Sequence, residues 1–239
     1  QKGQIIGKAT LATGYEQEKA SEESLAQAVK DAGLAKEGVQ KIFATGSGRT
    51  SLKIADDTVD EIKAMAKGAH FFFPHARTVI DIGAEEGRAA KMDEQGNVED
   101  FAINEKCAAG AGAFIEGMAR ALDVAVEEMG PLCLQSDRQI PMNAQCVIFA
   151  ESDVVNLIHA NTEKPEISKA IHDAIASRIA SIIRRIGINE DIVTLGGVGY
   201  NLGFIDALRR ELKIDTIYIP DEPEYGAAVG AAILAAETA

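Results

Sequence analysis

The sequence predicts an α/β fold in which helices pack against mixed sheets. Two patterns indicate it: short apolar runs typical of buried strands alternate with longer stretches whose apolar residues recur every three or four positions. A third observation is composition, because 46% of the 239 residues are hydrophobic. Such a chain can bury the core of one large domain or of two modest ones, and disorder is excluded.

The first 75 residues alternate between strands and helices. Acidic residues open the last predicted helix of this region, as a helix N-terminus favours, and Pro74 stops it. A new hairpin layer begins directly afterwards, so we expect a domain boundary at residues 73–77. The expected elements are a strand over 4–12, a helix over 16–32, a strand over 39–45 that runs into a glycine turn, and a helix over 56–73.

The middle of the chain predicts a hairpin followed by two helices that each carry a cysteine at the N-terminal edge. The apolar run before Gly83 is typical of a buried strand, and the polar turn over 93–97 separates two further strand-like runs. The expected elements are strands over 78–83, 88–92 and 98–103 and helices over 108–122 and 145–159.

The last third contains the longest amphipathic pattern. Isoleucines recur at three-or-four spacing from Ile167 to Ile186 over about five turns, and Gly187 ends this helix. The remaining expected elements are a strand over 192–195, a helix over 204–212, a strand over 216–219 and a small-residue helix over 225–236.

Charge and cysteine content exclude several classes of function. A net charge of −13 repels phosphate backbones and anionic lipid headgroups, so we expect neither a nucleic-acid nor a membrane partner. No apolar run approaches the roughly 20 residues that span a bilayer, and the start of the sequence has no signal-peptide pattern, so we expect a cytoplasmic protein. Three cysteines do not form a disulfide framework.

Two glycine-containing turns follow predicted strands and are candidate nucleotide-binding loops. In the first, Asp81 and Gly83 open the stretch DIGAEEGR, where backbone N–H groups could approach phosphate oxygens and the carboxylate could hold a magnesium ion. In the second, the stretch LGGVG, the three glycines lack the side chains that would otherwise keep a base or sugar away from the backbone. Each pattern alone is also compatible with an ordinary turn or a strained loop.

Cys107 and Cys146 are candidate metal ligands because each leads into a predicted helix. The free N–H groups and positive dipole end of a helix N-terminus favour an anionic cluster. Their separation differs from zinc-ribbon spacing, and a four-iron cluster usually takes about four thiolates, so a second subunit would have to supply the other pair. The alternative is that both are small buried hydrophobic residues. Cys133 has no cluster-like context, and we interpret it as structural.

Together these motifs resemble the BadF/BadG/BcrA/BcrD ATPase family over nearly the whole chain. The CAAGxG block at Cys107 and the CxxFAES block at Cys146 are the specific ones, whereas the glycine turns are shared by actin-like ATPases. The resemblance implies an actin-like fold of two ribonuclease-H-like domains with nucleotide between them. It implies a first domain over 1–75, a second over 76–222 and a C-terminal helix over 223–239 that returns to the first.

The resemblance also implies the site residues and cofactors. Cys107 and Cys146 match the two ligands that each subunit gives to a [4Fe-4S] cluster on the two-fold axis of a dimer. Asp81 matches a catalytic residue beside Mg²⁺. The residues that match contacts to ATP are Gly83, Ala84 and Glu85 in the second phosphate loop, Gly110 and Gly112 after the first cysteine, and Gly196, Gly197 and Gly199 in the adenosine motif.

The implied activity is ATPase-driven electron transfer in an anaerobic metabolism. In such proteins nucleotide binding and hydrolysis rotate the domains, change the angle between the cluster helices and drive a low-potential electron onto a partner. The partner is a 2-hydroxyacyl-CoA dehydratase or a benzoyl-CoA reductase component, and reduced ferredoxin or flavodoxin is the expected donor. The two subunits of the dimer can be identical or homologous.

Two departures from the family pattern keep alternatives open. The first phosphate loop and its strands would lie before Gln1, so a subunit that holds a cluster without hydrolysing ATP remains an alternative. The loop after Asp81 continues AEEGR where dehydratase activators read GQDSK, which favours a benzoyl-CoA reductase type subunit. A small-molecule kinase of the actin fold is the other alternative, but a kinase has no use for Cys107 and Cys146 at helix starts.

Overall fold

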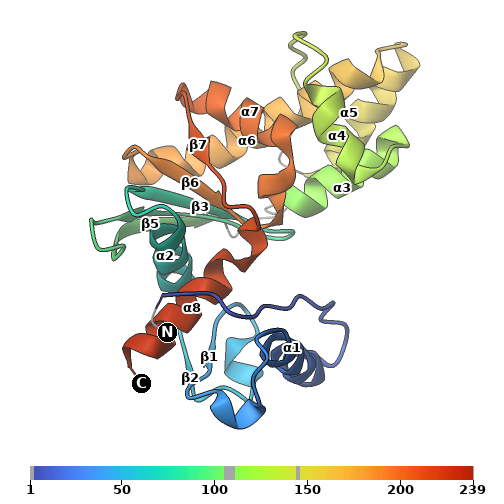
Figure 1. Cartoon of the computed structure of the whole chain (residues 1–239). Helices are drawn as coiled ribbons and strands as arrows, with labels where there is room; N and C mark the ends of the chain where they lie inside the picture. Colours follow the sequence, from blue (N-terminus) through green and yellow to red (C-terminus); the bar gives the residue numbers. More distant parts are fainter. Residues whose placement is uncertain (1–2, 105–110, 144–145, 239) are drawn as a thin grey trace.

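The computed structural model describes residues 3–104, 111–143 and 146–238. A larger part, which contains a sheet and several helices, and a smaller part around the N-terminal helix are joined by helices α2 and α8 (Figure 1). The mixed α/β architecture agrees with the sequence prediction. The predicted domain limits at residues 75 and 222 remain predictions.

The larger part is built on a five-stranded mixed sheet with the strand order β5-β4-β3-β6-β7. The first three strands of this part form an antiparallel meander, whereas β6 and β7 continue the sheet in parallel with β3. All five strands were predicted, with ends that differ by one or two residues. Their bounds are β3 Thr78–Ile82, β4 Gly87–Met92, β5 Val98–Asn104, β6 Ile192–Leu195 and β7 Ile217–Tyr218.

Helices cover both faces of this sheet because its central strands are apolar on both sides. Val79 of β3 belongs to an apolar cluster with Met65 of helix α2, which spans Glu61–Phe72. The neighbouring residue Ile80 points to the other face and clusters with Ile175 of the long helix α6. Helix α2 therefore lies on one face and α6 on the other.

In the described ranges, five helices form the lobe on the α6 side of the sheet. Four were predicted, and their apolar faces join one cluster with the sheet. The fifth, α4, was missed because Gly130 and Pro131 lie inside it and both residues disfavour a helix interior. The bounds are α3 Ala111–Leu122, α4 Val126–Cys133, α5 Val147–His159, α6 Lys164–Ile186 and α7 Leu202–Leu212.

The smaller part contains helix α1 and a two-stranded parallel sheet. Helix α1 was predicted, but the strand expected over 39–45 is reduced to two residues. The helix expected over 56–73 starts later, because Asp60 accepts hydrogen bonds from the first N–H groups of α2 and caps it there. The bounds are α1 Gln17–Asp31, η1 Lys36–Gly38, β1 Phe43–Ala44, η2 Arg49–Ser51 and β2 Asp57–Thr58.

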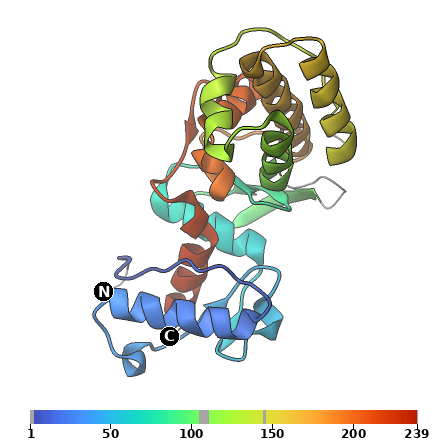
Figure 2. The ribbon, with the colours of Figure 1, turned by 90° about the vertical axis from the view of Figure 1, so that its right-hand side faces the viewer.

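The strand predicted over 4–12 is wrong. This segment is extended but runs along helix α1 instead of pairing with a strand (Figure 2). The backbone N–H of Lys8 donates to the carboxylate of Asp31 at 3.2 Å, and the hydroxyl of Ser24 donates to the carbonyl of Ala9 at 3.3 Å. Side chains of α1 thus take up backbone groups that a neighbouring strand would otherwise bind.

Helices α2 and α8 cross in close contact at glycines. A Cβ atom added at Gly230 of α8 would overlap the carbonyl oxygen of Ala64, and one added at Gly68 of α2 would overlap that of Gly226. Helix α8 spans Gly226–Glu237 and follows the short helix η4, Pro223–Tyr225. The small-residue helix predicted near the C-terminus therefore packs on α2. Among the described residues, no helix is long and apolar enough to span a membrane.

Candidate functional site

The two glycine turns predicted from the sequence lie side by side at one edge of the main sheet. They follow β3 and β6, which pair in parallel with Asp81 opposite Leu195. Parallel strands end at the same edge, so the turn at Gly83 and the turn at Gly196 meet there. The sequence predicted each turn separately, and the fold brings them together.

Gly196 is required by the close approach of these two turns. Its φ of +83° lies in the left-handed region, and a Cβ atom there would come within 2.7 Å of Asp81 Oδ1. Its N–H donates to the carbonyl of Pro223 at 2.9 Å. The adjacent Gly197 begins the short helix η3, Gly197–Tyr200, and a Cβ atom there would meet nothing within 4 Å. Bare backbone therefore faces open space beside the Asp81 carboxylate.

Helix α3 begins directly on the turn after β3. The N–H of Gly112 donates to the carbonyl of Gly83 at 3.1 Å, and the N–H of Ala113 donates to that of Ala84 at 2.9 Å. A side chain at position 112 would meet the backbone of Ala84 at 2.9 Å, so only glycine allows this contact. The segment that carries Cys107 and Gly110 leads into this helix, and both residues lie outside the described ranges.

A charged cluster that the sequence did not predict lies next to Asp81. Arg88 of β4 pairs with Glu61 at the start of α2 and with Glu86, and Glu61 also accepts from Arg49 at 3.1 Å. Burial raises the pKa of the Asp81 carboxyl, the charge of Arg88 opposes this, and Glu61 adds to it. The acidic start of the helix predicted over 56–73 was the one local signal for Glu61.

The residues at this edge fit a magnesium nucleotide. The open glycines admit a ligand to the backbone, and the Asp81 carboxylate is the oxygen donor that Mg²⁺ prefers. Among the described residues, no group of three or more His, Cys, Asp or Glu side chains could hold a metal ion without other ligands. A magnesium ion here would share its ligands with nucleotide phosphates. The predicted contacts of Ala84, Glu85 and Gly199 also lie in these turns, and their roles remain predictions.

Cys146 occupies the N-cap position of helix α5. It is half-buried with extended backbone, and its carbonyl accepts the N–H of Ala150 at 3.0 Å. The prediction that this cysteine stands at the N-terminal edge of a helix is confirmed. Directly after it, the side chains of Ile148 and Phe149 are 69% and 62% exposed. Two exposed apolar residues thus follow a partly accessible thiol within three positions of the chain.

Cys133 has the opposite environment. It lies at the end of α4, only 2% exposed, with its sulfur 3.8 Å from the carbonyl oxygen of Gly203. Burial is the main cause that raises the pKa of this thiol to about 11, so it stays protonated and unreactive at neutral pH. Its surroundings are those of a packed side chain.

Solved structures give the class of the protein. The (R)-2-hydroxyglutaryl-CoA dehydratase component A of Acidaminococcus fermentans superposes with a TM-score of 0.93 at 34% identity, covering 99% of this chain and 90% of that one. The activator of the 2-hydroxyisocaproyl-CoA dehydratase from Clostridium difficile, solved with bound ADPNP, superposes with a TM-score of 0.85 at 34% identity, covering 96% and 83%. Fold and loops together define an actin-like ATPase.

Sequence comparison gives the family. The model of the BadF/BadG/BcrA/BcrD ATPase family matches residues 1–235, and the chain belongs to that family. The activator of lactoyl-CoA dehydratase from Anaerotignum propionicum is 39% identical over 216 residues, covering 90% of this chain and 83% of the relative. A benzoyl-CoA reductase subunit from Thauera aromatica is 34% identical over 221 residues, covering 90% and 78%.

Proposed function

We propose that this chain is an ATP-dependent activator that passes a low-potential electron to an acyl-CoA dehydratase or benzoyl-CoA reductase component. Cys107 and Cys146 of each subunit hold a [4Fe-4S] cluster shared across a dimer. When bound, the cluster supplies the electron and ATP supplies the free energy that drives it onto the partner. Reduced ferredoxin or flavodoxin reloads the activator in the cytoplasm of an anaerobic cell.

The observation that carries this proposal is the position of Cys146. Its thiol stands at the N-terminus of a helix of 13 residues, where free N–H groups and the helix dipole favour an anionic cluster. Helix α5 exposes large apolar side chains that a second subunit would cover on forming the dimer. They are Ile148, Phe149, Val155 and Ile158.

Asp81 and the neighbouring glycines are the proposed nucleotide site. The Asp81 carboxylate holds Mg²⁺ or orients water, and Gly83, Gly196 and Gly197 let the nucleotide lie against the backbone. Support comes from the open backbone at Gly197 and from ADPNP in a homologous activator.

The start of helix α3 connects this site to the cysteines. Its first N–H groups bind the carbonyls of Gly83 and Ala84, so a shift of the phosphate turn pulls directly on the helix that follows Cys107. Helix α5, which follows Cys146, packs on α3 where Val147 lies against Gly117. A nucleotide-dependent movement of the turn would therefore change how the two helices present the cluster.

The names of the relatives indicate the partner's chemistry. Activators of lactoyl-CoA and 2-hydroxyisocaproyl-CoA dehydratases and a benzoyl-CoA reductase subunit are all similar to this chain. All three partner reactions act on an acyl-CoA thioester. We propose an acyl-CoA substrate that binds to the partner component and not to this chain.

Iron content of the anaerobically purified full chain tests this function. We expect a brown protein with about four iron atoms per dimer and ATPase activity. Cys146→Ser removes two of the four thiolates in the dimer, so it should lose most of the iron. Cys133→Ser is the matched control, because its sulfur packs against Gly203, and it should keep the iron.

Two outcomes would contradict the proposal. A colourless, iron-free dimer that binds ATP would leave an actin-fold kinase as the better function. Equal iron loss in the Cys133→Ser and Cys146→Ser proteins would contradict the assignment of the ligands.

A further inference from the structure

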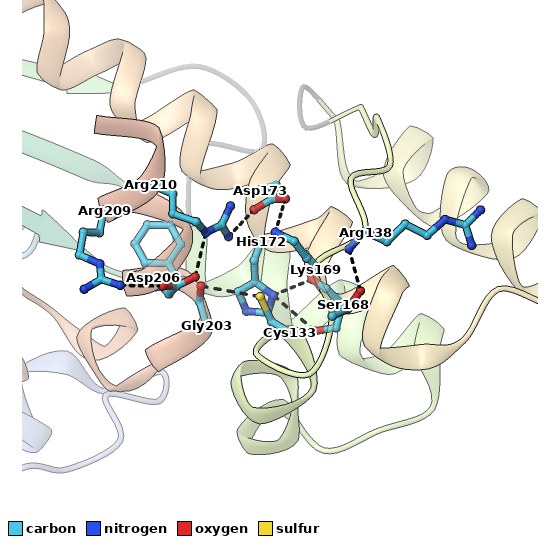
Figure 3. A network of polar contacts seen from close by, with 12 residues as sticks. Cys133, Arg138, Ser168, Lys169, His172, Asp173, Gly203, Asp206, Arg209 and Arg210 are labelled. Atoms are coloured by element: carbon cyan, nitrogen blue, oxygen red, sulfur yellow. Dashed lines mark hydrogen bonds and ion pairs between the residues drawn. The ribbon is translucent and has the colours of Figure 1, made fainter. Parts of the chain in front are cut away.

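His172 is a buried histidine outside the proposed nucleotide and cluster sites. It lies on helix α6 and has no exposed surface, and Figure 3 shows its ring between Ser168 on the same helix and Gly203 at the start of α7. Helix α4 adjoins the ring's neighbour, because the Ser168 hydroxyl donates to the carbonyl of Met129 at 2.7 Å. The ring therefore stands where three helices of the lobe meet.

Both ring nitrogens of His172 face hydrogen-bond acceptors. Nδ1 lies 2.7 Å from the backbone carbonyl oxygen of Ser168, and Nε2 lies 3.1 Å from Asn201 Oδ1. The Asn201 atom is an oxygen because it also accepts the backbone N–H of Phe204 at 3.0 Å, which caps helix α7. The Ser168 hydroxyl, 3.4 Å from Nδ1, already donates to the carbonyl of Met129 at 2.7 Å.

A neutral imidazole carries one N–H, so it can donate to only one of these two oxygens and sets the lone pair of its other nitrogen against the second. The doubly protonated ring satisfies both, but burial lowers the pKa of His172 below its ordinary value of 6.5. The Ser168 carbonyl, Asn201 and the charge of Asp173 oppose this effect, and Lys169 adds to it. Burial and hydrogen bonding thus favour different protonation states.

The charged groups around the ring are paired with one another. On α6, Lys169 donates to Asp173 at 2.9 Å, and from α7 Arg210 reaches the same carboxylate at 2.7 Å and Asp206 at 2.9 Å (Figure 3). On α4, the Cys133 thiol stays neutral because its pKa is raised to about 11. Among these groups, the His172 ring is the one whose ordinary pKa lies closest to neutral pH.

Asn201 connects this ring to the glycine loop. It follows η3 directly, its N–H donates to the carbonyl of Val198 at 2.9 Å, and the N–H of Gly199 donates to that of Gly196 at 3.0 Å. The backbone of Asn201 therefore closes the end of the loop, while its side chain caps the start of α7. An N–H at Nε2 of His172 that donates to Asn201 Oδ1 would hold the C-terminal end of the loop more firmly than a bare ring nitrogen.

We propose that His172 is a positioning residue for the nucleotide loop Gly196–Tyr200, and that a second proton on its ring tightens nucleotide binding by fixing Asn201. This inference rests on the proposed nucleotide site. A loop held in its binding conformation binds more tightly, because less of the binding free energy is used to order it.

The sign of the pH dependence follows from the lowered pKa. The doubly protonated ring forms only as the pH falls below about 6.5, so nucleotide affinity should rise there and binding should take up a proton. Over the same range the free protein should lose stability, because the unfolded chain binds this proton more readily than the folded chain.

Titration of the full chain with a fluorescent ADP and Mg²⁺, between about pH 5.5 and about pH 8, tests the inference. The native chain should bind severalfold more tightly at the acid end. His172→Gln offers an amide donor that does not titrate, so its affinity should vary little with pH. His172→Met has no donor and should bind about tenfold more weakly than the native chain at the acid end. His159→Gln, on the exposed end of α5, is the control and should keep the native profile.

Asn201→Asp should shift the pH dependence of nucleotide affinity in the opposite direction to the loss of the His172 ring. Its carboxylate still caps α7 but stabilises the imidazolium, so the affinity profile should move to higher pH. Circular dichroism should establish that each variant is folded. A native profile in His172→Gln, or an unmoved profile in Asn201→Asp, would overturn the inference and leave the proposed function standing. Absence of nucleotide binding in the folded native chain at every pH would overturn both.

Discussion

Helix α6 buries 13 of its 23 residues, whereas none of the 15 residues of helix α1, all of which the structure describes, is fully buried. Helix α6 packs against both the main sheet and α7, and its isoleucines join the largest apolar cluster. Helix α1 is held by surface contacts, such as the pair of Lys53 and Glu18 at 3.1 Å. Two helices of the same chain therefore differ greatly in how much of their surface other elements cover.

This difference indicates where the free energy of folding resides. Burying an isoleucine side chain contributes about 1.5–3 kcal/mol, whereas an exposed ion pair contributes about 0–1 kcal/mol. The larger part should therefore unfold as the main cooperative unit, while α1 and its neighbours contribute little to that transition.

Shortening a core residue of α6 should give the largest effect. Ile175 is completely buried against the sheet side of the cluster, so Ile175→Ala should lower the free energy of unfolding by about 2–5 kcal/mol, as measured by urea denaturation. Leu25→Ala, on the half-buried side of α1, should lower it by less than about 1 kcal/mol. Equal losses in the two variants would contradict the contrast between the helices.

A substitution at the contact of α8 with α2 should give the next largest loss in the free energy of unfolding. Gly230→Ala places a methyl group on the carbonyl of Ala64, so the helices must separate, and we expect a loss of about 1–3 kcal/mol. Ala232→Ser on the exposed side of α8 is the control and should change the melting temperature by no more than a few degrees. If Gly230→Ala left the free energy of unfolding unchanged, the two helices would be able to move apart at no cost in stability.

The fold could be predicted largely from residue spacing. The strands of the main sheet and the isoleucine helix have strong local periods, so they were found with small errors at their ends. The prediction failed where tertiary contacts decide: the segment over 4–12 reads as a strand, but its backbone groups bind side chains of α1. Helix α4 was missed because Gly130 and Pro131 contradict its local pattern.

The site was only partly predictable. Cys146 and the two glycine turns have local motifs, so the sequence identified them before their positions were known. The charged cluster comes from three separate elements, which contribute Arg49, Glu61 and Arg88. Their spacing along the chain does not predict that they lie together. His172 was indistinguishable from any other residue on the inner side of a long helix. Residues that are brought together only by the tertiary fold can be identified as a group only from the structure.

Helix capping gives the smallest and sharpest comparison between the two regions. Asp60 accepts two N–H groups at the start of α2, whereas Glu16 at the same position of α1 makes no side-chain cap in the described chain. Asp60→Ala should therefore lower the free energy of unfolding by about 1 kcal/mol, with a shift of the denaturation midpoint at constant slope.

Glu16→Ser should instead strengthen α1, seen as slower amide hydrogen exchange in its first turn, because serine supplies the missing acceptor. Since α1 lies outside the main core, this gain should leave the main unfolding transition within about 0.5 kcal/mol of the native value. A gain as large as the loss at Asp60 would mean that α1 unfolds together with the larger part, and the contrast between the two regions would then fail.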